Sequence, residues 1–149
     1  MTTQPPGDRF PIAELAPVSW AVMQLGHQQR GLAATLLAEL GLFPGQELML
    51  AQLWGREGRS QKELGELLGL DHSTVAKSVQ RLERAGLVRR ARSAADGRVT
   101  LVELTDAGAR LEGPIRAVWA ELEARWANSL THEQRAAAVL LAGLNPVSS

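Results

Sequence analysis

Two capped helices joined by a tight turn are the feature of this sequence that most restricts its fold. The run SQKELGELLGL begins with Ser60 and carries Glu63 three residues later, the capping-box pattern of a helix start. Gly69 suits the turn that follows, because glycine readily adopts the left-handed conformation after a helix. Asp71 is a preferred N-cap residue for the next helix, and Gly86 follows that helix as a stop. The spacing therefore predicts a helix-turn-helix.

A basic hairpin is predicted directly after these helices. The runs LVRRARS and RVTLVELT flank AADG, which supplies a glycine for the turn. In the second run Val99, Leu101 and Leu104 are apolar, and the alternation slips near Val102. Two helices followed by a two-stranded hairpin predict a winged helix-turn-helix, whose second helix fits the major groove of DNA.

The second helix of this motif has two chemically different sides. At 100° per residue, Val75, Val79 and Leu82 share one side, which predicts its buried face. The opposite side contains no acid, because Glu83 lies off it. Cations bind phosphates, while short hydroxyls, amides and guanidinium groups read base edges. We expect DNA contacts from Ser73, Thr74, Lys77, Ser78, Gln80, Arg81 and Arg84.

Roles along this side follow from chemistry. Arg81 can form a bidentate pair with guanine, and Lys77 suits a phosphate or a guanine. Ser73 and Thr74 lie near the helix N-terminus, where backbone N–H groups also favour phosphate. A solvated helix with a cationic side by chance is the alternative, and the adjoining short helix and basic hairpin count against it.

Positive charge is concentrated in the same region. The 149-residue sequence has 16 Lys and Arg and 16 Asp and Glu, so its formal net charge is zero. Residues 72–98 nevertheless carry seven Lys or Arg against two acids. A local basic patch is the electrostatic signature of a surface that binds a polyanion.

The hairpin tip holds further candidate contacts. An arginine such as Arg98 can enter a narrow minor groove, where negative potential is concentrated, and Asp96 would fix its direction. An incidental Asp-Gly turn is the alternative for the hairpin taken alone. We expect wing contacts with DNA from Arg92, Asp96 and Arg98.

A long helix is predicted before the helix-turn-helix. It begins at Pro17, after a loose N-terminal tail of residues 1–16. Trp20, Met23 and His27 fall on the side opposite an apolar stripe. A helix that is apolar on two sides is buried on both, and in a short chain a second copy is the expected cover. The stripe consists of Val18, Val22, Leu25, Leu32 and Leu36.

A second long helix is predicted after the hairpin. It begins at Thr105 or Asp106, and Pro114 predicts a kink or a break in it. A final helix is capped by Thr131, with Gln134 three residues later. The fold class is therefore mainly α with a small β-wing. Helices at 17–43 and 105–149 are expected to dimerise the chain around a DNA-binding lobe at 44–104.

Several classes of function are disfavoured. The absence of cysteine excludes disulfides and thiolate metal sites. His27, His72 and His132 are dispersed, and no nucleophile or phosphate-loop motif is present, so we expect neither an enzyme nor a metal or cofactor site. No apolar run reaches the ~18 residues of a membrane span, and the N-terminus lacks a signal pattern, so we expect a cytoplasmic protein.

The runs LGLDHSTVAKSVQRLERAGLVRR and RSAADGRVTLVELTDAG resemble the MarR family of winged helix-turn-helix transcriptional regulators. The resemblance covers nearly the whole chain. The family wing pattern D-R-R-x-x-x-x-x-L-T-x-x-G departs here at Gly97, which replaces the first arginine. The matching positions are Asp96, Arg98, Leu104, Thr105 and Gly108.

The resemblance implies a homodimeric repressor with interlocked terminal helices. It implies two recognition helices in successive major grooves of a pseudo-palindromic operator, and helical spacing places half-sites ~10 bp apart. It also implies release by a small phenolic or lipophilic effector bound between the dimerisation helices and the DNA-binding lobe.

Candidates for an effector pocket are apolar and aromatic residues with one polar group, which suit an aromatic ligand. The alternative is that these residues form dimer core. Two other functions remain open: a constitutive DNA-binding protein without an effector, and a partner-binding module that has lost DNA binding. The pocket candidates are Trp20, Met23, His27, Trp54 and Trp119.

Overall fold

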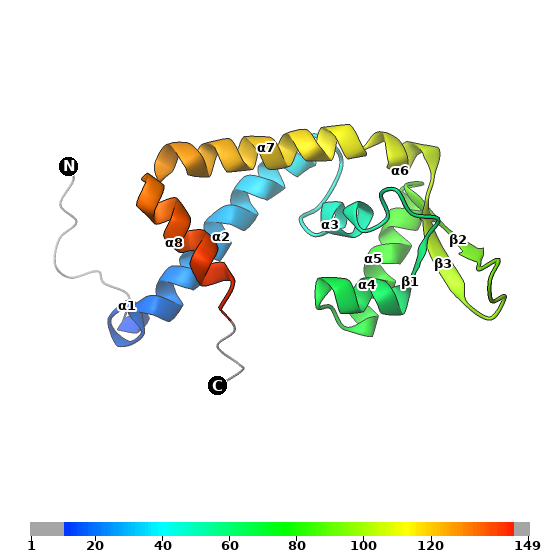
Figure 1. The fold of residues 1–149 in the computed structure, drawn as a ribbon, viewed down its shortest axis with the longest axis horizontal. Coiled ribbons are helices and arrows are strands. Elements are labelled where there is room, and N and C mark those ends of the chain that lie inside the picture. Colours follow the sequence, from blue (N-terminus) through cyan, green and yellow to red (C-terminus); the bar gives the residue numbers. More distant parts are fainter. Residues whose placement is uncertain (1–10, 145–149) are drawn as a thin grey trace.

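The computed structural model describes residues 11–144, which form a lobe at residues 46–110 and a helical arm at residues 11–38 and 132–142, joined by a long helix (Figure 1). The long helix α7 runs along one side and reaches from the lobe to the arm. The elements in chain order are α1 (Pro11–Leu15), α2 (Pro17–Ala38), α3 (Gln46–Ala51), β1 (Arg59–Ser60), α4 (Gln61–Leu68), α5 (His72–Arg84), β2 (Val88–Arg92), β3 (Thr100–Leu104), α6 (Asp106–Arg110), α7 (Glu112–Ser129) and α8 (His132–Ala142).

The predicted helix-turn-helix is formed by α4 and α5. The capping box is present: the Glu63 N–H donates to Ser60 Oγ over 3.2 Å, and the Ser60 N–H donates to Glu63 Oε2 over 2.7 Å. Gly69 ends α4 in the left-handed conformation, with φ 64°. Asp71 caps α5 through its side chain. These local interactions fix both helix starts and the turn between them.

The wing is a sheet with strand order β1-β3-β2, and all pairs are antiparallel. The sequence predicted only the two strands β2 and β3. The structure adds a third strand, β1, in which Arg59 pairs with Val102 of β3. A two-residue strand leaves no hydrophobic period to recognise in the sequence. Val102 is the fully buried residue of β3, while Val99 is exposed. The slip in alternation thus marks the residue that turns toward the core.

The break predicted near Pro114 is present between α6 and α7. Proline lacks an N–H and its ring clashes with the carbonyl four residues earlier, which here is that of Arg110. α6 ends at Arg110 and α7 begins at Glu112.

The core of the lobe continues into one half of α2. Ala33 and Leu37 of α2 are buried, and Ile115 and Leu122 of α7 join the same cluster. In the predicted stripe of α2, Leu32 and Leu36 pack against this cluster. The stripe residues left exposed within one chain are Val18, Val22 and Leu25.

The two terminal segments differ in how well they match the structure predicted from the sequence. The capping box of α8 at Thr131 and Gln134 is present. Pro11–Leu15 form helix α1, which corrects the expected loose tail over 11–15, and residues 1–10 lie outside the described part of the chain. Between residues 11 and 144 no helix is long and apolar enough to cross a membrane.

Candidate nucleic-acid interface

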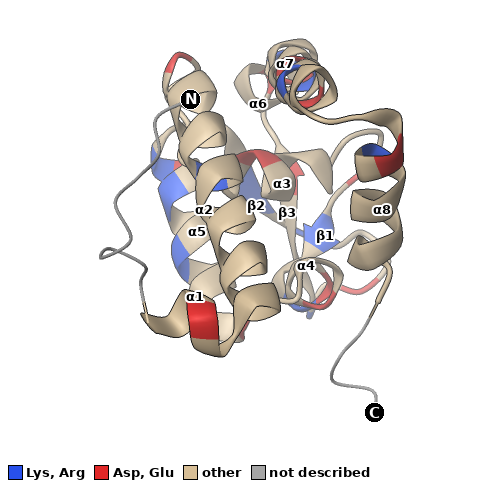
Figure 2. Ribbon diagram, turned by 90° about the vertical axis from the view of Figure 1, so that its left-hand side faces the viewer, with Lys and Arg blue, Asp and Glu red and all other residues tan. Residues whose placement is uncertain are grey.

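The outer side of α5 carries cationic and polar residues, and its Lys and Arg positions lie along one edge of the ribbon in Figure 2. Val75, Val79 and Leu82 are fully buried beneath it, as the spacing predicted. Within the described residues, no hydrogen bond or ion pair occupies the exposed side chains of Lys77, Gln80, Arg81 and Arg84. We call these four residues the α5 cationic face.

Two arginines of the basic segment are paired with acids and contribute less free charge. Arg89 Nη2 lies 3.0 Å from Glu103 Oε2, across the β2–β3 pair. Arg90 Nε lies 3.3 Å from Glu83 Oε2, which ties β2 to the end of α5. The acid that lies nearest the face in sequence is therefore turned toward the wing. The uncompensated positive charge is left on the α5 cationic face and at the wing tip.

The N-terminus of α5 is occupied by the carboxylate of its own cap. Asp71 Oδ1 accepts the N–H of Thr74 and the hydroxyl of Ser73, both over 2.8 Å. Asp71 Oδ2 accepts the Thr74 hydroxyl over 2.7 Å. These hydrogen bonds hold the pKa of Asp71 far below its usual range, and the bond from the Thr74 hydroxyl has the largest effect. The carboxylate is therefore ionised.

This arrangement alters the chemistry expected of Ser73 and Thr74. Both lie on the predicted side of α5, with Ser73 exposed and Thr74 half-buried. Their hydroxyl protons point at Asp71, and the carboxylate fills the position where a phosphate was expected. Ser78, also in the predicted set, is half-buried.

The wing tip is braced through its backbone. The Arg98 N–H donates to Asp96 Oδ1 over 3.0 Å, so Asp96 fixes the chain at Arg98 rather than its guanidinium group. Arg92 Nη1 donates to the Gly97 carbonyl over 2.7 Å. The expected Asp96–Arg98 side-chain contact is thus replaced by a backbone contact. Within residues 11–144 the Arg98 side chain has no partner.

The base of the wing is held to α5 by a contact that explains the Leu-Thr-x-x-Gly pattern. Thr105 Oγ1 donates to the Gly86 carbonyl over 2.6 Å and accepts the Gly108 N–H over 3.1 Å. A Cβ at Gly108 would lie 2.0 Å from the Leu87 carbonyl oxygen. Only glycine permits this approach, so the pattern fixes the wing relative to the recognition helix.

The five effector candidates are spread over three parts of the fold. Trp20, Met23 and His27 lie on α2, where Met23 is 55 % exposed and Trp20 is half-buried. Trp54 follows α3 and is half-buried, and its Nε1 is buried without a partner in the described part of the chain. Trp119 lies on α7 and is 41 % exposed. None of the five lines the cavity described next.

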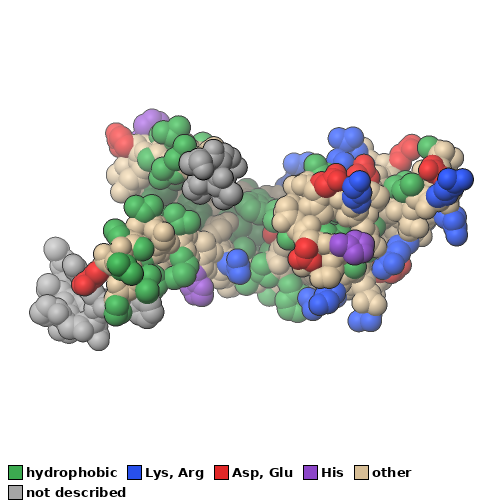
Figure 3. Space-filling model, turned by 90° about the horizontal axis from the view of Figure 1, so that it is seen from below, with side chains coloured by type: hydrophobic (Ala, Val, Ile, Leu, Met, Phe, Trp, Pro, Cys, Tyr) green, Lys and Arg blue, Asp and Glu red, His purple; other side chains and the backbone are tan. Residues whose placement is uncertain are grey.

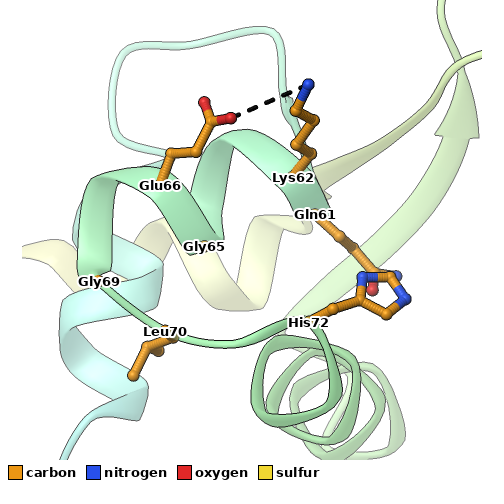
Figure 4. A pocket seen from close by; sticks show the side chains of 7 residues that line it. All are labelled: Gln61, Lys62, Gly65, Glu66, Gly69, Leu70 and His72. Carbon is orange, nitrogen blue, oxygen red and sulfur yellow. Dashed lines mark ion pairs between the residues drawn. The ribbon is translucent and has the colours of Figure 1, made fainter.

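A cavity of about 360 Å³ lies instead in the lobe, between α4 and the start of α5 (Figure 4). An exposed ion pair between Lys62 and Glu66, 4.0 Å apart, stands at its rim. Sequence reasoning missed this cavity, because it is created by the packing of α4 against the turn. The lining residues are Gln61, Lys62, Gly65, Glu66, Gly69, Leu70 and His72.

Comparison with known proteins places this geometry in a family. The family model described as MarR family matches residues 31–99, which contain the whole helix-turn-helix together with β1 and β2. This segment of the chain is that of a MarR-family protein.

The relatives of this chain include curated regulators. It is 42 % identical over 94 residues to the HTH-type transcriptional regulator TtmR of Methylorubrum extorquens (strain PA1), a match that covers 63 % of this chain and 48 % of TtmR. The chain spans about half the length of the curated relatives it matches. These relatives are transcriptional regulators rather than enzymes.

Solved structures match nearly the whole chain. A probable transcriptional regulator from Pseudomonas aeruginosa is 30 % identical, with a TM-score of 0.68, and the match covers 81 % of this chain and 94 % of that one. The transcriptional repressor CouR, bound to a 23-mer DNA duplex, is 25 % identical with a TM-score of 0.79. The match covers 91 % of this chain and 96 % of CouR. The mainly helical winged helix-turn-helix fold of this chain is therefore that of the family.

Proposed function

We propose that this MarR-family chain is a DNA-binding transcriptional repressor that acts as a homodimer on a pseudo-palindromic site. The observation that carries the proposal is the α5 cationic face, which has neither an acid nor an internal partner within the described residues. Phosphates and guanine edges supply the acceptors that such a surface lacks. The similarity to CouR bound to a DNA duplex supports both the DNA partner and the repressor role.

The homodimer is supported by apolar surface on the arm. No residue of α8 is buried within one chain, and Val139, Leu140 and Leu141 are 77, 72 and 63 % exposed. Val18 and Val22 of α2 are equally uncovered. Figure 3 shows hydrophobic side chains gathered on the arm, while cations gather on the lobe. Contiguous apolar surface of this kind marks a protein interface, and a second copy offers the same surface in return.

The effector is proposed to be a small aromatic or lipophilic molecule that binds near Trp54. The ring of Trp54 lies beside Arg116 of α7, and its indole N–H has no partner among the described residues. An apolar ligand with one acceptor would satisfy that donor. Because Trp54 follows α3 and Arg116 belongs to α7, a ligand bound there would alter how these two helices pack.

Salt-dependent binding to duplex DNA tests the central proposal. Fluorescence anisotropy with labelled duplexes should give an affinity that falls linearly in log–log form, with a slope of about −0.9 per phosphate neutralised. A flat salt response would refute DNA binding and favour a partner-binding module. Sequencing of genomic fragments bound by the protein would identify the operator.

A second candidate is a constitutive DNA-binding protein without an effector. The exposure of Met23 and Trp119 favours it, because exposed side chains enclose no ligand. A panel of aromatic acids separates the two functions. A ligand that raises the melting temperature and releases DNA supports the effector-controlled repressor, whereas DNA affinity unchanged across the panel supports the constitutive protein.

A further inference from the structure

The hydroxyl groups at the start of the recognition helix have a fixed polarity. Ser73 Oγ lies 2.8 Å from Asp71 Oδ1, and Thr74 Oγ1 lies 2.7 Å from Asp71 Oδ2. An ionised carboxylate only accepts hydrogen bonds, so both hydroxyl protons must point toward Asp71. What each hydroxyl oxygen still offers to a third molecule is its lone pairs. Both groups therefore act as acceptors at this surface.

Acceptors at this position distinguish among the groups that DNA presents. Phosphate oxygens are acceptors, and so are guanine N7 and O6, adenine N7 and thymine O4, so none of them can bond these hydroxyl oxygens. The donors in the major groove are the exocyclic amino groups, N6 of adenine and N4 of cytosine. The exposed carboxylate of Asp71 adds another acceptor to the same cluster and repels phosphate.

The cluster is continuous with the α5 cationic face. Ser73, Lys77 and Arg84 lie within about 40° of one another around α5 at 100° per residue. A helix that brings Lys77 and Arg81 to the groove therefore brings Ser73 with them. The two parts of the helix differ in polarity, since its first turn accepts hydrogen bonds and its later turns donate them.

We propose that Ser73 and Thr74, oriented by Asp71, determine specificity by accepting a hydrogen bond from the exocyclic amino group of an adenine or a cytosine in each half-site. Asp71 acts as a positioning residue that orients the two hydroxyls, and Ser73, the more exposed of the two, makes the primary contact. This inference rests on the proposed function, because it requires that α5 enters the major groove of DNA.

The test begins with a random-sequence duplex library, from which the wild-type protein selects a consensus site. In that site, single adenines are replaced by purine and single cytosines by 2-pyrimidinone, which removes one amino group at a time. One such change per half-site should weaken wild-type binding about 5- to 100-fold. The same change should cost Ser73→Ala far less, because the primary contact is already lost, and should cost Thr74→Val less than the wild type, because one of the two acceptors is gone.

Comparing variants on the same DNA cancels the weaker base pairing of the analogues. Ser129→Ala is the matched control, since it removes an exposed helical serine hydroxyl on α7 that donates to the Arg125 carbonyl. Thr74→Ser keeps the hydroxyl and should keep the full penalty. Asp71→Asn retains a helix cap but frees a hydroxyl proton, so its selected consensus should shift toward guanine or thymine at that position.

The outcomes separate the two proposals. If the wild type enriches no sequence and binds without salt dependence, the proposed function itself fails. If it enriches a site but the amino-group penalties are identical in the wild type, Ser73→Ala and Thr74→Val, only the acceptor role fails. Equal loss of affinity for all sequences in both variants would likewise overturn the acceptor role, because it would indicate phosphate contacts.

Discussion

The guanidinium group of Arg116 lies over the indole ring of Trp54, with its central carbon 4.7 Å from the ring centroid. Arg116 is held there by Glu112, whose Oε1 accepts from its Nε and Nη2 over 3.0 and 2.7 Å. Arg116 belongs to α7 and Trp54 follows α3, so this contact joins the long helix to the lobe. It is thus placed to set the orientation of the lobe relative to α7.

Replacing Arg116 by alanine should lower the melting temperature. A cation–π contact of this kind contributes about 0.5–1 kcal/mol, and each kcal/mol shifts the melting temperature of a chain this size by about 2–4 °C. Arg125→Ala is the matched control, because Arg125 forms the same i,i+4 ion pair, with Glu121, and stacks on no ring among the described residues. Equal shifts in calorimetric scans of the two variants would contradict a specific role for the Trp54 contact.

Arg81→Ala should relax sequence choice if Arg81 reads a base. Loss of a contact between Arg81 and guanine should weaken binding to the selected site by about 1–3 kcal/mol and leave binding to random DNA nearly unchanged. Arg110→Ala, which removes an exposed cation from α6, provides the control. Competition titrations measure both affinities, and an equal loss on both DNAs would show that Arg81 contacts phosphate instead.

Arg98→Ala should weaken binding most on sites whose flanks have a narrow minor groove. The side chain is unpartnered within residues 11–144, and negative potential is highest where the groove is narrow. Anisotropy titrations on A-tract and G·C-rich flanks compare the two cases. Arg89→Ala serves as the control in the same wing, since Arg89 is paired with Glu103. Unchanged affinity of Arg98→Ala on A-tract flanks would rule out the wing contact.

Leu140→Asp should convert the protein to a monomer with weaker DNA binding. Leu140 is 72 % exposed in one chain, and a carboxylate cannot be buried there in a dimer without a large desolvation cost. Sedimentation velocity measures the mass, and circular dichroism checks that the lobe remains folded. Arg135→Ala is the control, because Arg135 lies about 140° away around α8. A Leu140→Asp protein that sediments as a dimer would show that α8 lies outside the interface.

Glu47→Gln should stabilise the fold at neutral pH. Glu47 is 3 % exposed, and burial raises the pKa of its carboxyl above the usual 4.5 despite the Gly45 N–H that it accepts over 2.7 Å. The raised pKa means that ionisation destabilises the folded chain. This cost is absent below pH 4.5 and fully present once the pH exceeds the folded pKa.

Glutamine keeps an acceptor for the Gly45 N–H and carries no charge. The melting temperature of Glu47→Gln should therefore exceed that of the wild type at pH 7, and the difference should vanish as the pH falls below 4.5. Glu123→Gln, at an exposed position on α7, is the control. A difference that is the same at pH 4 and pH 7 would refute the role of ionisation.

The sequence alone determined the features that depend on neighbours a few residues apart. The capping box at Ser60 and Glu63, the left-handed Gly69, the cap at Asp71 and the break before Pro114 are all local, so their residue types predict them. Helical spacing likewise separated the buried Val75 side of α5 from its polar side. The basic segment was visible as a charge count, although the roles of its side chains toward DNA stay predictions.

Tertiary structure decided everything that joins distant segments. The pairing of Arg59 with Val102, the stacking of Arg116 on Trp54 and the exposure of α8 depend on how helices and strands pack, which no local pattern encodes. The hydrogen bond from the Arg98 N–H to Asp96 and those from the Ser73 and Thr74 hydroxyls to Asp71 join residues only a few positions apart in the sequence. They depend on one choice of hydrogen-bond partner among several, and only the folded backbone geometry makes that choice.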